Sequence, residues 1–125
     1  MKIVVSTDST IPIYDQIRVQ VRSAILSGAV AAGTNLPSLR QLAADLRVSV
    51  ITITRAYNDL VAEGLVINEH GRGFVVLEVD PQTASTALRE RVNDVLEDLY
   101  TAAHHARLSS ADVHRLIDET WRAHD

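Results

Sequence analysis

The residues that could take part in recognition chemistry lie in three short stretches between residues 40 and 72. They are suited to contacts with DNA and comprise Arg40, Ser49, Val50, Ile51, Thr52, Thr54, Arg55, His70, Gly71 and Arg72. The guanidinium of Arg40 can bind a phosphate or fork onto the edge of a guanine. Arg72 stands between two glycines, so it could closely approach a narrow, A·T-rich minor groove, with a phosphate contact from His70. The alternative is an ordinary surface, with Arg40 capped by Asp45 or solvent and Arg72 in a solvated turn.

The middle stretch, residues 49–55, is rich in β-branched residues. Such residues are poor helix formers, so on an exposed helical face they need another explanation. A role in reading DNA supplies one, because their methyl groups can pack on thymine methyls and the threonine hydroxyls can donate or accept. The alternative is that Val50 or Ile51 simply packs inward.

Other kinds of site chemistry find little support. The chain contains no cysteine, which rules out disulfides and thiolate metal sites. No glycine-rich phosphate loop, nucleophile elbow or paired-histidine protease motif is present. His104, His105, Asp112 and His114 cluster loosely, but adjacent residues of a helix face about 100° apart, which favours a polar surface over a metal site. We therefore expect that the protein is not an enzyme and has no catalytic residue, metal or cofactor. The alternative is a small enzyme, but the sequence contains no recognisable pair of a nucleophile and a base.

Apolar residues recur with the helical period in the part of the chain that carries these candidates. Ser38 with Gln41 matches a capping box, and Ser49 is a second N-cap. A proline opens the first helix, and glycines end the first and the third. Residues 3–6 are expected to form a short strand or an extended arm. The expected helices cover residues 12–27, 39–47 and 49–63.

Two strand-like runs follow, at residues 65–69 and 74–77, with a glycine-containing connection at 70–73 that indicates a hairpin. The two short helices at 39–47 and 49–63 are typical of a helix-turn-helix, and the hairpin after them is typical of a wing. The second helix of such a pair enters the major groove with its N-terminal residues on the base edges. The sequence therefore predicts a mainly α fold with a small β-hairpin, a winged helix-turn-helix domain over residues 1–79.

Residues 80–125 form a tail of different character. After Asp80-Pro81 the pattern predicts a long helix and then a second helix capped around Ser109–Asp112, both amphipathic. Such a pair buries little surface alone, so we expect a two-helix dimerisation tail. The net charge of the chain is −4, and it is unevenly spread: residues 1–77 carry seven basic and six acidic residues, residues 78–125 five and ten. Any DNA contact should therefore come from the first part, with the acidic tail facing away.

The same residues resemble the winged domain of GntR-type regulators over about residues 11–77. The matching pattern comprises Pro12-Ile13-Tyr14-Asp15-Gln16-Ile17, Gly28 through Gly33, Leu36-Pro37-Ser38-Leu39-Arg40-Gln41-Leu42-Ala43, Val48-Ser49, Thr52, Arg55-Ala56-Tyr57, Leu60, Glu63-Gly64-Leu65 and Gly71-Arg72-Gly73-Phe74-Val75. The short tail is similar to that of the YtrA-like branch. The resemblance places DNA contacts on Arg40, Ser49, Thr52 and residues 70–72. Val50 and Thr54 depart from it, since basic residues are common there, so the operator sequence cannot be taken from relatives.

The resemblance implies a homodimer that represses its own operon, often beside a transporter operon. We expect a homodimer bound to double-stranded DNA at a near-palindromic operator. We also expect a cytoplasmic protein without a membrane segment. A small-molecule effector at the dimer interface and the absence of any effector both stay open, as does the choice between repressor and activator. The rival interpretation is a winged-helix protein-interaction module that no longer binds DNA, which the low basic charge and Val50 favour.

Overall fold

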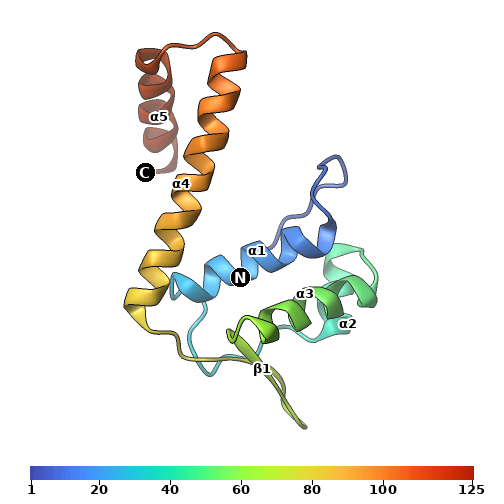
Figure 1. Ribbon diagram of the computed structural model, residues 1–125. Helices are drawn as coiled ribbons and strands as arrows, with labels where there is room; N and C mark the ends of the chain where they lie inside the picture. The colour runs from blue at the N-terminus through green and yellow to red at the C-terminus, as the bar shows by residue number, and fades with distance from the viewer. The chain divides into compact units, whose positions relative to one another are not determined.

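The computed structural model describes residues 1–125 and divides them into two compact units, an N-terminal unit, Met1–Leu88, and a C-terminal unit, Arg89–Asp125 (Figure 1). The elements are α1 (Ile13–Leu26), α2 (Leu39–Leu46), α3 (Val50–Ala62), β1 (Val66–Glu69), β2 (Gly73–Val76), α4 (Pro81–His105) and α5 (Ser110–His124). This order confirms the predicted fold class, a winged helix-turn-helix followed by two helices. None of the helices has the length and apolar character needed to cross a membrane.

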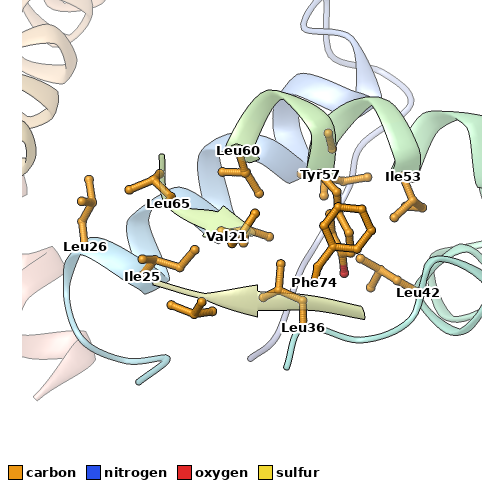
Figure 2. Packing of buried hydrophobic residues seen from close by; sticks show 14 of the residues in the cluster. Val21, Ile25, Leu26, Leu36, Leu42, Ile53, Tyr57, Leu60, Leu65 and Phe74 are labelled. Carbon is orange, nitrogen blue, oxygen red and sulfur yellow. The ribbon is translucent and has the colours of Figure 1, made fainter. Parts of the chain in front are cut away.

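The core of the N-terminal unit lies between α1, α2, α3 and the hairpin (Figure 2). Side chains at helical spacing on α1 and α3 meet there, and Ile17, Ile53 and Leu60 are fully buried. Tyr57 joins this core edge-on to Phe74 of β2, with ring centroids 5.0 Å apart. Its hydroxyl donates to the carbonyl of Pro37 at 2.9 Å, which ties α3 to the segment that leads into α2. Burial raises the pKa of Tyr57, so the hydroxyl keeps its proton and stays a donor.

Replacing Tyr57 by phenylalanine should therefore lower the free energy of unfolding by about 1 kcal/mol, because the ring packing stays and only the hydrogen bond is lost. Urea denaturation followed by circular dichroism, at one fixed protein concentration, measures the change. Tyr100→Phe is the matched control, since this hydroxyl forms no hydrogen bond within the chain and the ring lies outside the core of the N-terminal unit. Equal urea midpoints for the two variants would contradict the proposed role of this bond.

The serine caps of α2 and α3 are confirmed. The hydroxyl of Ser38 accepts from the backbone N–H of Gln41, and that of Ser49 accepts from Thr52, each at 3.1 Å. The reciprocal half of the predicted capping box at Ser38 is wrong, because the Gln41 side chain donates to Asp45 at 2.8 Å instead of turning back. Asp45 lies one turn further along the helix and gives the amide a charged acceptor, the stronger kind of partner.

Residues 3–6 were predicted to form either a short strand or an extended arm. They belong to no strand and form an extended arm. Two glutamines of α1 hold the arm, because each side-chain amide bonds to the backbone N–H and carbonyl of one arm residue, as a neighbouring strand would. Gln20 accepts from the N–H of Val4 at 3.0 Å and donates to its carbonyl at 2.7 Å. Gln16 does the same with Ser6, at 2.8 and 2.9 Å. Backbone groups that would otherwise need a sheet are thereby satisfied.

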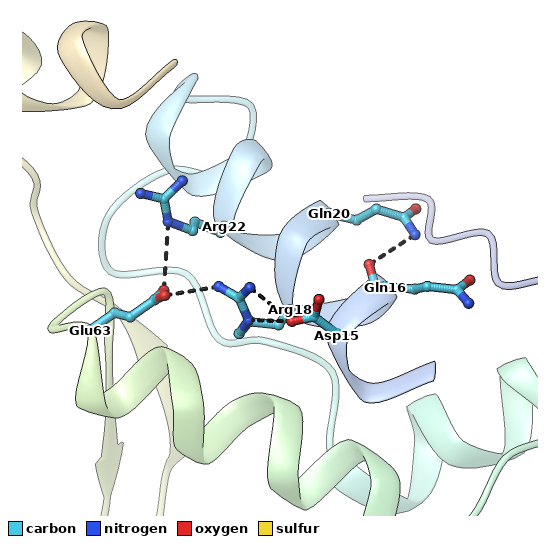
Figure 3. A network of polar contacts seen from close by, with 6 residues as sticks. All are labelled: Asp15, Gln16, Arg18, Gln20, Arg22 and Glu63. Carbon is cyan, nitrogen blue, oxygen red and sulfur yellow. Dashed lines mark hydrogen bonds and ion pairs between the residues drawn. The ribbon is translucent and has the colours of Figure 1, made fainter. Parts of the chain in front are cut away.

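A network of ion pairs joins α1 to the end of α3 (Figure 3). The guanidinium of Arg18 lies 2.8 Å from Asp15 and 2.9 Å from Glu63. Arg22 approaches the second oxygen of Glu63 at 3.7 Å. Two of the basic side chains in the N-terminal unit are therefore used within the fold.

The hairpin is antiparallel, with Val66 opposite Val76 and Glu69 opposite Gly73, so its tip is residues 70–72. Each strand begins one residue from its predicted start: Leu65 precedes β1, its N–H bonding to Leu60 at 3.1 Å, and Gly73 already pairs in β2. The other edge of β2 is also covered, because residues 33–36 bond to it through a bridge between Asn35 and Val75. Figure 1 shows the hairpin projecting beyond the three helices.

In the C-terminal unit, α5 begins with the complete capping box that α2 lacks. Ser109 accepts from the N–H of Asp112 at 3.1 Å, while the Asp112 carboxylate accepts from the N–H of Ser109 at 2.9 Å. These bonds, together with Arg115, hold the pKa of Asp112 below its usual value. The predicted apolar faces are largely uncovered, and no residue of α5 is buried. The large exposed apolar side chains are Val92, Val95, Leu96, Tyr100, Leu108, Leu116, Ile117 and Trp121.

Candidate nucleic-acid interface

The helix-turn-helix exposes the N-terminal end of α3. Arg47 ends α2 in the left-handed conformation, with φ of 56°, and Ser49 then caps α3. Ile51 is 81% exposed and Val50 is 42% exposed, so the alternative in which they pack inward is wrong. Two apolar side chains at the start of an exposed helix face present methyl groups of the kind that can meet a thymine methyl.

The hydroxyl groups on the same helix are already engaged. Ser49 and Thr52 share a hydrogen bond of 2.9 Å between their side-chain oxygens, in addition to the cap. Thr54 donates its proton to the carbonyl of Val50 at 2.8 Å. Since a hydroxyl has one proton and two lone pairs, Thr54 can only accept from a partner while this bond holds. The amino groups of adenine and cytosine in the major groove are such partners.

Arg55 lies one turn along α3 from Ile51, and its guanidinium carbon sits 3.7 Å from the centre of the Tyr14 ring. This cation–π contact fixes the flat face of the guanidinium on α1. The N–H groups, which lie in the plane at the edges of the guanidinium, stay available to a phosphate. Tyr14 was not predicted as a site residue. The one signal that pointed to it is its place in the segment 12–17, which resembles the GntR-type pattern.

Arg72 does not extend freely from the tip of the hairpin as the sequence suggested. Its guanidinium donates to the carbonyl of Gly33 at 2.9 Å and lies 3.6 Å from the carboxylate of Glu69. The side-chain amide of Asn35 donates to the Arg72 carbonyl, which fixes the backbone of the tip as well. The turn is made possible by Gly71, whose φ of +77° is unfavourable for other residues. His70 is exposed at the same tip.

A hollow of about 530 Å³ lies between the start of α2 and the hairpin. We call it the α2–wing hollow, and it is lined by Asn35, Leu36, Pro37, Ser38, Leu39, Arg40, Asn68, Arg72, Gly73 and Phe74. It brings together two predicted site residues, Arg40 and Arg72, that are separated by 32 positions in the sequence. The candidates on α3, from Ser49 to Arg55, do not line it and form a second group. Asn35 and Asn68, which were not predicted, supply neutral polar groups to the hollow.

The arginines of the N-terminal unit differ in whether they form ion pairs within the fold. Arg18 and Arg22 pair with Glu63, and Arg72 pairs with Glu69. Three exposed arginines form no ion pair: Arg40 at the start of α2, Arg47 in the turn before α3, and Arg55, which stacks on Tyr14. Sequence reasoning missed Arg47, although a basic residue between two helix-turn-helix helices is a detectable signal. Arg40 and Arg47, at the two ends of α2, could therefore bind a phosphate without first breaking an ion pair.

Comparison with known proteins gives a consistent result. Residues 13–76 match the model of the family described as "Bacterial regulatory proteins, gntR family". The chain is 32% identical over 111 residues to the HTH-type transcriptional repressor YtrA of Bacillus subtilis, an alignment that covers 89% of this chain and 85% of YtrA.

Solved structures show the same relationship. YtrA from Sulfolobus acidocaldarius is 34% identical, with a TM-score of 0.58 over 74% of this chain and 97% of that chain. The DNA-binding domain of AraR in complex with operator ORE1 is 28% identical, with a TM-score of 0.51 over 61% of this chain and 93% of that one. The match to the family model, the similarity to YtrA over most of both chains and the winged fold agree: the chain belongs to the GntR family of bacterial regulatory proteins, in the neighbourhood of YtrA.

Proposed function

We propose that this chain is a transcriptional repressor that binds double-stranded operator DNA as a homodimer. The observation that carries the proposal is the α2–wing hollow, where Arg40 and Arg72 converge beside the exposed start of a helix-turn-helix. Two arginines supplied by different elements to one concave surface suit a phosphate backbone that passes between them. The AraR domain, which has the same fold, is complexed with operator DNA, and YtrA of B. subtilis is named a repressor.

In the proposed complex, α3 enters the major groove with Val50, Ile51 and Thr54 near the base edges. The wing tip, residues 70–72, reaches the adjacent minor groove. Ser49, Thr52 and Arg55 contact the backbone or the base edges at the rim of α3. Residues 1–79 are thus the proposed DNA-binding domain.

Residues 80–125 are the proposed dimerisation tail. Its uncovered apolar side chains include Trp121, 69% exposed, and Leu96, 50% exposed. Large apolar side chains left exposed in this way often mark an interaction surface. A second copy of the tail would cover this surface, and the twofold symmetry of the pair would require an operator with near-palindromic half-sites. A groove of about 350 Å³ between α4 and α5, bordered by Tyr100, His104 and His114, is the candidate place for an effector, whose existence stays a prediction.

Fluorescence anisotropy of the full chain with DNA from upstream of its own gene tests this proposal, against a shuffled duplex of the same composition. We expect preference for the upstream duplex and a loss of affinity of about 10³-fold between 50 and 200 mM salt, as for about six phosphate contacts in a dimer. Equal and weak binding to both duplexes would overturn the proposal and favour the protein-interaction module instead.

A further inference from the structure

The wing carries an acidic residue at the place where the proposed complex brings it to a polyanion. Glu69 ends β1, and its carboxylate lies 3.6 Å from the guanidinium of Arg72, across the three-residue tip. Both side chains are about half exposed, at 51% and 50%. A surface pair of this kind adds little to stability, so its main consequence is for the charge that the wing presents.

The two acceptors of Arg72 differ in how they would respond to DNA. The carbonyl of Gly33, at 2.9 Å, is a neutral backbone group in the segment that covers the edge of β2. The Gly33 carbonyl can go on accepting from one nitrogen of the guanidinium while the other N–H groups bind a phosphate, because the guanidinium has five N–H donors. The carboxylate of Glu69 competes with a phosphate for the same positive charge.

We propose that Glu69 sets the DNA affinity of the wing by competing with DNA for Arg72. This inference rests on the proposed function. When DNA binds, Arg72 exchanges Glu69 for the backbone or the minor groove, and the released carboxylate is left facing DNA and needs a cation from solution. Glu69 therefore weakens the contact and lowers the number of cations released on binding, whereas Gly33 and Asn35 keep the tip in position. Glu69 thus affects DNA binding through its competition for Arg72.

The test is Glu69→Gln in the full chain, which removes the charge but keeps the size of the side chain. We expect binding of the dimer to the upstream duplex to tighten by about three- to tenfold, because the exposed Glu69–Arg72 ion pair of each subunit no longer has to be broken. The slope of log Kd against log salt should steepen by about one for each subunit. Glu78→Gln is the matched control, because Glu78 is exposed, forms no ion pair and removes the same net charge; we expect little change in either quantity.

The same substitution in an Arg72→Ala background separates competition from general electrostatics. With no arginine to compete for, Glu69→Gln should then have no larger effect than Glu78→Gln. Equal effects of the two glutamine variants in the wild-type background would overturn the inference while leaving the proposed function intact. Weaker binding by Glu69→Gln would also overturn it, by showing that Glu69 holds Arg72 in its binding position. Absence of DNA binding by the wild type itself would instead overturn the proposed function on which the inference rests.

Discussion

Replacing Leu96 by lysine is expected to convert the proposed dimer into monomers and to weaken operator binding by about 10²-fold or more. Leu96 is 50% exposed in the C-terminal unit, among other uncovered apolar residues of α4 such as Val92 and Val95. A side chain that is covered by a second copy cannot carry a charge without losing its hydration, and an apolar interface offers no compensating partner. The N-terminal unit should keep its fold, because Leu96 lies outside it.

The loss of DNA binding follows from the loss of pairing. Two linked domains bind the second half-site at a high effective concentration, and a monomer loses that gain without losing any contact of its own. The lysine also makes the test strict. An added positive charge would by itself strengthen attraction to DNA, so weaker binding by Leu96→Lys must come from the broken dimer.

Sedimentation velocity gives the oligomeric state, and anisotropy with the upstream duplex gives the affinity. Thr101→Lys is the matched control, because five residues along a helix turn the side chain by about 140°, away from the apolar face. It should stay dimeric and bind at least as well as the wild type. A Leu96→Lys protein that remains a dimer at micromolar concentration would exclude this face as the interface between copies.

Local rules explain why much of the fold was predictable. The helices follow from apolar residues at a period of 3.6, and their ends follow from single residues: Ser38, Ser49 and Ser109 cap three helices as predicted. The hairpin followed from two strand-like runs and the glycines between them. Each of these signals acts within a few residues, so no knowledge of the packing was needed.

The partners of the site side chains were not predictable, because they come from distant segments. Arg72 bonds to Gly33, 39 residues away, and Arg55 stacks on Tyr14, 41 residues away. No periodicity encodes such pairs, since each depends on how the loop before α2 and the start of α1 pack against the rest. Sequence could therefore name the arginines of the proposed interface but not decide which of them are held by the fold.

Of the two arginines that line the α2–wing hollow, that distinction makes Arg40 the more consequential one. It is exposed on the rim of the α2–wing hollow and forms no ion pair. The residue expected to cap it, Asp45, is taken by Gln41. Arg40 can therefore meet DNA without first giving up a partner, unlike Arg72. Its position on the first helix of the helix-turn-helix favours the phosphate backbone over a guanine edge, since this helix crosses the backbone.

Arg40→Ala is accordingly expected to weaken binding to the upstream duplex by about 10²-fold, as two charged hydrogen-bonded contacts are lost per dimer at roughly 1.5 kcal/mol each. The loss should be similar on a shuffled duplex, and the salt slope should fall by about one per subunit, because a phosphate contact carries no sequence information. Arg122→Ala, which removes an exposed arginine from the C-terminal unit, is the control and should bind as the wild type does.

Arg40→Lys decides between the two kinds of contact. A lysine keeps the positive charge but lacks the planar fork that grips the two acceptors of a guanine. If Arg40 meets a phosphate, the lysine variant should retain most of the affinity and the full salt slope. A lysine variant as weak as alanine on the upstream duplex, but unimpaired on the shuffled one, would place Arg40 on a guanine edge instead. Because that result would make α2 as well as α3 a reader of sequence, it would also change which operator positions are expected to tolerate substitution.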